Sequence, residues 1–112
     1  MTDARSFAGE PQRLRALASY HILDSEPEEA FDDMAAVARQ LCGTQAALIS
    51  FVDRDRQWFK ARIGFDRPET DLDSSVCRYA LDAPALLVID DLSLDPRTAA
   101  NPLVRDGPRL RF

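Results

Sequence analysis

The strongest constraint in this sequence is a pair of strand-like segments joined by four charged residues. Residues 46–52 read AALISFV and are apolar on both faces, which is typical of an interior strand. Residues 57–63 alternate between apolar and polar side chains. Because the connecting residues 53–56 are few and all charged, the two segments are predicted to form a hairpin. We expect the 46–52 strand to be the most buried element, with Phe51 in the core.

Two helices are predicted before the hairpin. Pro11 opens a pattern that indicates a helix over about 10–20. A second helix follows the segment SEPE, residues 25–28, whose Ser-x-x-Glu form indicates a capping box, and it ends at Gly43. Its apolar residues recur at helical spacing and are predicted to face the core; they are Phe31, Met34, Ala35, Ala38, Leu41 and Cys42.

After the hairpin the pattern is more broken. Residues 64–73 are predicted to form an exposed loop, and Ser74 or Ser75 is predicted to cap a short helix that runs through Asp82. Residues 86–89 are predicted to form a short buried strand. Residues 92–108 contain three prolines and a glycine, which indicates a long loop with room for one helical turn.

The two ends of the sequence carry separate expectations. Residues 1–9 are predicted to be a flexible terminus. Residues 109–112 alternate like the beginning of a strand that then stops. A sheet with so few partners would leave open edges, so we expect a chain cut within its fold, which alone would be unstable, swapped or dimeric.

Composition narrows the class of protein. A chain of 112 residues, with 46% apolar and 29% charged residues, has the size and composition of one globular domain. The net charge of −5 and the dispersed basic residues disfavour nucleic-acid binding. No apolar run approaches the roughly 18 residues of a membrane span, and the N-terminus lacks a secretion signal, so we expect a cytoplasmic protein.

Several sequence segments together carry a family resemblance. Residues 11–34, PQRLRALASYHILDSEPEEAFDDM, and residues 47–64, ALISFVDRDRQWFKARIG, resemble the opening of a bacterial GAF sensor domain. Later landmarks of the same domain follow in the same order: Glu69-Thr70, Ser75-Val76-Cys77, LVIDD at 87–91, DPR at 95–97 and NPLV at 101–104. The resemblance covers about residue 10 to the end. A complete member of the family continues past Phe112 into two further strands, a Leu-Gly-x-Leu-type segment and a C-terminal helix.

The resemblance implies a fold and a function. The implied fold is α/β (α+β), a GAF- or PAS-like antiparallel sheet with helices packed on one face, here a partial domain over residues 10–112, incomplete at the C-terminus. The implied function is to bind a small molecule of unknown identity and to modulate a linked or partner signalling domain, namely a histidine kinase, a diguanylate cyclase or a phosphodiesterase. A homodimer is expected, and the cofactor is unknown. The predicted ligand-binding residues are Phe51, Val76, Cys77 and Leu81.

Cys77 raises alternative chemistries. GAF domains that attach bilin chromophores generally place His after the reactive Cys, whereas Arg78 follows here. The free methionine sulfoxide reductases, which share the fold, use several cysteines, and Cys42 is expected on the buried face of a helix. A non-enzymatic sensor without catalytic residues is therefore predicted, with a thiol-dependent reductase centred on Cys77 as a distant alternative. The main alternative is a dimerisation module of a signalling protein that binds no ligand.

Other polar residues are interpreted as structural. His21 stands near the end of the first helix, where the helix dipole favours it. Trp58 shares a strand face with Lys60 and Arg62, and packing is favoured over ligand stacking. The acidic residues at 66, 69, 71 and 73 lack the spacing of a calcium loop, and two cysteines with one histidine cannot form a structural zinc site, so no metal is predicted. Asp95 and Asn101, each before a proline, are predicted to shape turns.

Overall fold

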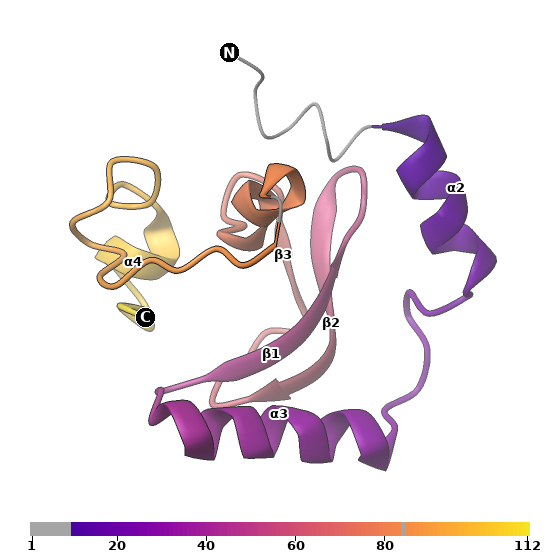
Figure 1. Ribbon diagram of the computed structural model, residues 1–112, viewed down its shortest axis with the longest axis horizontal. Helices are drawn as coiled ribbons and strands as arrows, with labels where there is room; N and C mark the ends of the chain where they lie inside the picture. The colour runs from indigo at the N-terminus through magenta and orange to yellow at the C-terminus, as the bar shows by residue number, and fades with distance from the viewer. Residues whose placement is uncertain (1–9, 84) are drawn as a thin grey trace.

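A computed structural model describes residues 10–83 and 85–112 (Figure 1). The predicted flexible segment 1–9 lies outside the described residues. The elements are α2 (Pro11–Ser19), α3 (Glu29–Cys42), β1 (Ala47–Val52), β2 (Arg56–Ile63), β3 (Glu69–Asp71), the 3-10 helix η1 (Cys77–Asp82) and α4 (Pro102–Arg105). The strands form one antiparallel sheet in the order β1-β2-β3. Helices and an antiparallel sheet therefore confirm the predicted mixed α/β class.

The predicted helices form, but the second one begins differently from the prediction. Gly43 ends α3 with a φ of 63°, the left-handed conformation that glycine tolerates, as predicted. Glu28 precedes α3 without a side-chain cap, so the capping-box prediction is wrong. The Ser25 hydroxyl instead donates to the Ile22 carbonyl at 2.6 Å and accepts from the Lys60 ammonium at 2.8 Å. Because α3 begins only at Glu29, Ser25 lies three residues before the N-cap, and its hydroxyl bonds to Ile22 and Lys60 instead.

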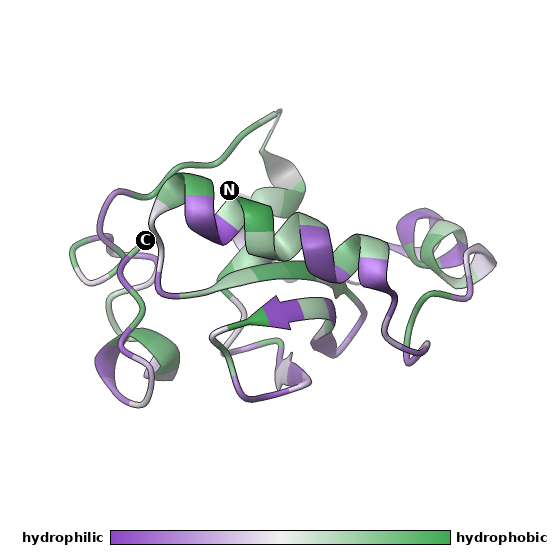
Figure 2. Cartoon of the chain, turned by 90° about the horizontal axis from the view of Figure 1, so that it is seen from below, coloured by the Kyte–Doolittle hydropathy of each residue, from purple (hydrophilic) through white to green (hydrophobic). Residues whose placement is uncertain are grey.

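The predicted inner face of α3 is only partly buried. Ala35 is buried and Phe31 is half-buried, but Met34 is 59% exposed and Leu41 is 81% exposed. Cys42, predicted to face the core, is exposed as well. In Figure 2, which views the molecule from the α3 side, the helix runs lengthwise beside the strands. A single helix that rests on a sheet buries one narrow stripe, which here is centred on Ala35.

The hairpin is present, and its second strand is the buried one. β1 and β2 pair antiparallel, with an irregularity between Ile49 and Ser50. Residues 57–61 of β2 are all buried, whereas β1 is half-buried apart from Val52, and Phe51 is half-buried too. The prediction that β1 would be the most buried element is therefore wrong. β2 lies between β1 and β3 and is covered on both faces, while β1 is an edge strand.

The chain after the hairpin departs from the prediction in three places. Residues 69–71, predicted as loop, form β3 against β2 and bury Thr70. Residues 86–89, predicted as a buried strand, have no regular structure, and Leu86 is 82% exposed. Residues 109–112 also form no strand. A short apolar segment becomes a strand only where a neighbour pairs with it, and in the described part of the chain β2 is already paired on both sides.

The long loop agrees with its prediction. It contains one short helix, α4, and the Asn101 side chain caps this helix by accepting from the Leu103 backbone N–H at 2.8 Å. The Asp95 carboxylate accepts from the Arg97 backbone N–H at 2.8 Å. Both residues therefore shape turns, as predicted. The loop adds Leu103 to a cluster with Phe59 and Phe65, so it closes one end of the core.

Candidate functional site

The two faces of β2 have different coverings. Lys60 points to α3, since its ammonium lies 5.5 Å from the Phe31 ring. Because side chains alternate along a strand, Gln57 and Phe59 point to the other face, where η1 and α4 lie (Figure 1). We call this second face, which bears Val52, Gln57 and Phe59, the distal face.

A buried polar network links η1 to the hairpin on the distal face. The Gln57 amide donates to the Ser50 hydroxyl at 3.0 Å and accepts from the Ser75 hydroxyl. Ser75 is 1% exposed, and its oxygen also accepts from the Arg78 backbone N–H at 3.2 Å. The Ser50 hydroxyl donates to the Cys77 sulfur at 3.8 Å. Polar groups at this depth are stable only when they are hydrogen-bonded, so the network fixes the start of η1 to β1 and β2.

The structure places three of the four predicted ligand residues on η1 or beside it. Cys77 and Leu81 pack against the buried pair Val52 and Leu72, and Val76 directly precedes η1. Phe51 neighbours Val52 in β1, so its side chain points to the opposite face of the sheet. The structure therefore brings Cys77 and Leu81 together and separates Phe51 from them.

Two buried polar atoms near this network lack a hydrogen-bond partner among the described residues. They are the Thr70 hydroxyl and the Arg78 Nε. Thr70 pairs with Gln57 across β3 and β2. Arg78 otherwise donates to the Leu72 carbonyl at 2.9 Å and to the Tyr79 hydroxyl at 2.7 Å. A hydroxyl and a guanidinium N–H that are unpaired at this depth are groups that a polar ligand could satisfy.

Ser50, Gln57 and Thr70 are not among the site residues predicted from the sequence. Ser50 is the one polar residue in the apolar run 46–52, and Gln57 is the first residue of the alternating segment 57–63. A polar residue in an otherwise apolar strand was the available signal, because such a residue needs a buried partner. The partner itself, Ser75, comes from a separate segment that no local pattern connects to them.

The cavities near α3 are lined by other residues. One cavity of about 520 Å³ lies between the start of α3 and β2, with Pro27, Asp32, Trp58 and Arg62 among its lining residues. Another, of about 500 Å³, lies at the end of α3 beside Gly43. Neither is lined by the four predicted ligand residues. Trp58 is buried in the wall of the first cavity, while the Lys60 ammonium contacts Phe31.

The remaining candidate groups have structural surroundings. His21 is exposed at the end of α2, and its backbone N–H donates to the Ala18 carbonyl at 3.1 Å. Glu69 accepts from Arg56 at 2.8 Å, and Asp71 accepts from the Ser74 N–H at 2.7 Å. Within residues 10–83 and 85–112, no group of three His, Cys, Asp or Glu side chains could hold a metal ion. No helix in these ranges is both long and apolar enough to cross a membrane.

Comparisons with known proteins agree with this architecture. The model of the GAF domain family matches residues 26–112, which include α3, all three strands, η1 and α4. A cyclic di-GMP phosphodiesterase of Pseudomonas aeruginosa is 40% identical over 91 residues, which make up 81% of this chain and 16% of that protein. The chain therefore spans about a sixth of the length of this relative. The family match covers most of the sequence and of the described fold, and the chain belongs to the GAF domain family.

Proposed function

We propose that this GAF domain is a sensory and regulatory module that binds a small molecule on the distal face and modulates a linked signalling output. The observation that carries the proposal is the buried polar network beneath η1, together with the unpartnered hydroxyl of Thr70. A polar network under a short 3-10 helix offers hydrogen bonds to a ligand, and Cys77 and Leu81 of that helix offer apolar contact beside them. The domain is proposed to act by binding, with no catalytic residue.

The proposed ligand residues are those of η1 and its neighbours. Val76, Cys77 and Leu81 supply apolar contact, and Gln57 supplies an amide that can both donate and accept. Phe51 stays a predicted ligand residue, but its side chain lies on the opposite face of the sheet from the other three. It would therefore contact a ligand on that opposite face. Substitution of Phe51 therefore tests a different surface from substitution of Leu81.

The linked output is proposed to be a signalling enzyme. The relative from Pseudomonas aeruginosa is a cyclic di-GMP phosphodiesterase, and this chain matches only a sixth of it. Of the three outputs that the resemblance implied, a phosphodiesterase is therefore the best supported. We propose a cytoplasmic homodimer in which the GAF domain regulates such a linked domain.

A second candidate function rests on the outer side of α3. Met34, Val37 and Leu41 are spaced as one helical stripe and are 59%, 53% and 81% exposed. An exposed apolar stripe is typical of an interaction surface. On this alternative the domain joins copies of a signalling protein and binds no ligand.

One purification separates the two candidates. The protein, at its natural length and from its own host, is examined for a co-eluting small molecule by mass spectrometry and absorbance, and for mass by light scattering. The sensor proposal expects a bound molecule that is lost in Leu81→Ala and kept in Leu41→Ser. An empty protein whose dimer dissociates in Leu41→Ser would support the dimerisation module instead. Binding that survives in Cys77→Ser would exclude covalent attachment of the bound molecule through that thiol.

A further inference from the structure

The helix α2 is attached to the rest of the molecule in an unusual way. No residue of α2 is buried. Figure 1 shows it beside the closed end of the β1–β2 hairpin, away from α3. The Arg13 guanidinium donates to the Val52 carbonyl at 2.5 Å, at the end of β1. Leu14 and Leu17 are only half-buried, and the Arg13 hydrogen bond ties the helix to the end of the hairpin.

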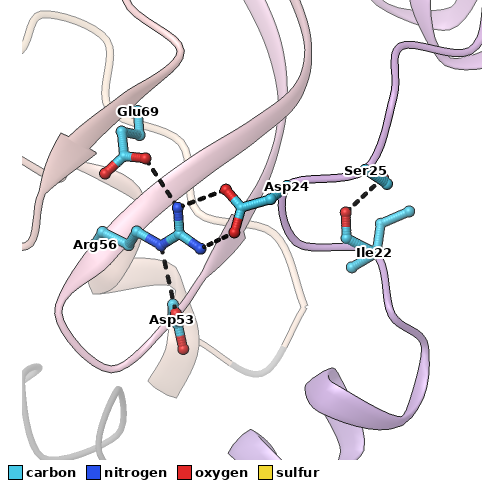
Figure 3. A network of polar contacts seen from close by, with 6 residues as sticks. All are labelled: Ile22, Asp24, Ser25, Asp53, Arg56 and Glu69. Atoms are coloured by element: carbon cyan, nitrogen blue, oxygen red, sulfur yellow. Dashed lines mark hydrogen bonds and ion pairs between the residues drawn. The ribbon is translucent and has the colours of Figure 1, made fainter.

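The segment that follows α2 is held to β2 by an exposed ion pair. Arg56 binds Asp24 with two hydrogen bonds, Nη1 to Oδ1 at 2.9 Å and Nη2 to Oδ2 at 2.7 Å (Figure 3). The same guanidinium reaches Glu69 at 2.8 Å and Asp53 at 3.5 Å. The Asp24 side chain is 64% exposed. This contact is therefore open to solvent and to salt.

The next residues are held by a contact of the opposite kind. The Lys60 side chain is fully buried, and its ammonium binds the Glu28 carboxylate at 2.7 Å. It also donates to the Ser25 hydroxyl at 2.8 Å and to the Glu26 carbonyl at 2.5 Å. Screening by salt is much weaker for such a buried charge than for an exposed pair. Arg56 thus binds Asp24 at the surface, and Lys60 binds the adjacent residues 25–28 in the interior.

The backbone between α2 and Ser25 makes a tight turn. His21 and Asp24 have φ values of 52° and 61°, in the left-handed region, which His and Asp adopt more readily than most residues other than glycine. The Ser25 backbone N–H donates to the Ile22 carbonyl at 3.1 Å and closes the turn. The turn is therefore held locally, and the Asp24 carboxylate ties it to Arg56 of β2.

We propose that α2 and residues 20–24 form a detachable arm, latched to the sheet by the Arg56–Asp24 pair and by the Arg13 bond to the Val52 carbonyl, and hinged at residues 25–28, which the buried Lys60 holds. High ionic strength, or a partner that competes for Arg56, frees the arm while the sheet and α3 stay folded. The arm ends at Asp24, because the contacts change from exposed to buried between Asp24 and Ser25. The proposal concerns the N-terminal arm and does not depend on ligand binding at the distal face.

Hydrogen exchange read by mass spectrometry tests the arm in the full chain. Peptides from residues 10–24, from 25–35 and from β2 are compared at roughly 20 mM and 500 mM salt. The hydrogen-exchange rate of residues 10–24 is expected to rise about fivefold at high salt, because salt removes the contribution of an exposed ion pair. The exchange rates of residues 25–35 and of β2 are expected to stay unchanged. A rise of the same size in all three regions would overturn the proposal.

A variant of Asp24, the exposed partner of Arg56, tests the latch without disturbing the folded core. Asp24→Asn removes the charge without touching a buried group, and it is expected to raise exchange in 10–24 at low salt to the high-salt level. The matched control is Asp33→Asn, which removes the same charge from an exposed position on α3. Equal exchange in Asp24→Asn and Asp33→Asn would show that Arg56 and Asp24 do not latch the arm.

Discussion

The ammonium group of Lys60 on β2 lies 2.7 Å from the carboxylate of Glu28, and only the carboxylate reaches solvent. This ion pair joins the central strand β2 to the residue that precedes α3. Each partner therefore has a different consequence when it is removed.

Glu28→Ala is expected to destabilise the fold more than Lys60→Met. The first change leaves a buried ammonium without its counter-charge, which costs about 3 kcal/mol. The second removes the buried charge and leaves Glu28 free to hydrate, at a cost of about 1 kcal/mol in lost hydrogen bonds. Urea unfolding of the two variants gives the ranking, and the opposite order would contradict the burial of Lys60.

Phe59→Ala is expected to cost about 3 to 5 kcal/mol of unfolding free energy, because Phe59 is buried in the central strand. Its ring packs edge-on against Phe65 with centroids 5.3 Å apart. Phe51→Ala makes the same chemical change in the edge strand, where the ring is half-buried, and should cost about half as much. Equal losses in denaturant titrations would mean that the two strands are equally buried.

Gln57→Ala and Ser75→Ala are expected to be coupled. Each change leaves the other side chain with an unsatisfied buried group, at about 1 to 3 kcal/mol. The double variant should therefore cost less than the sum of the two, with an interaction energy of about 0.5 to 3 kcal/mol. Ser19→Ala, which removes an exposed hydroxyl, is the control. Its free energy of unfolding should stay within about 0.5 kcal/mol of that of the original chain. Strict additivity would argue against the network.

Loss of the charge on Asp95 is expected to open the loop in acid. Hydrogen bonds from the side chain and the backbone N–H of Arg97 lower the pKa of Asp95 from 3.8 to about 2. Since the folded-state pKa lies below the unfolded value, the stabilisation is present above about pH 4 and is lost as the pH falls toward 2. Carboxyl NMR titration should give the lowered pKa, and Asp95→Asn should flatten the pH dependence of unfolding in that window. An ordinary titration near 3.8 would refute the turn geometry.

Gly64→Ala is expected to be far more damaging than Gly43→Ala. Both glycines have a positive φ, which alone costs an alanine about 1 kcal/mol. A Cβ on Gly43 would meet nothing within 4 Å, whereas a Cβ on Gly64 would lie 2.3 Å from the Gln45 carbonyl oxygen. The clash is with backbone that cannot rotate away, so the Gly64 variant should lose roughly 3 kcal/mol. Thermal unfolding of both variants measures the difference.

Features with a local cause could be read from the sequence. The hairpin follows from four charged residues between two strand patterns, and the end of α3 follows from the left-handed conformation that Gly43 allows. Asn101 caps α4 because its short side chain reaches a backbone N–H two residues away. The family resemblance over most of the chain is confirmed by the match over residues 26–112.

Features that depend on a distant neighbour were decided only by the tertiary structure. An apolar run shows that β1 tolerates burial, but the strand order places β2 in the centre and β1 at the edge. Ser25 has the sequence of a helix cap, yet it binds Lys60, which lies 35 residues further along the chain. Residues 69–71 form a strand because β2 pairs with them. Residues 86–89 form no strand, because none of the described strands pairs with them. The local pattern specifies what a segment can become, while its burial and hydrogen-bond pairing depend on which distant segment lies beside it in the fold.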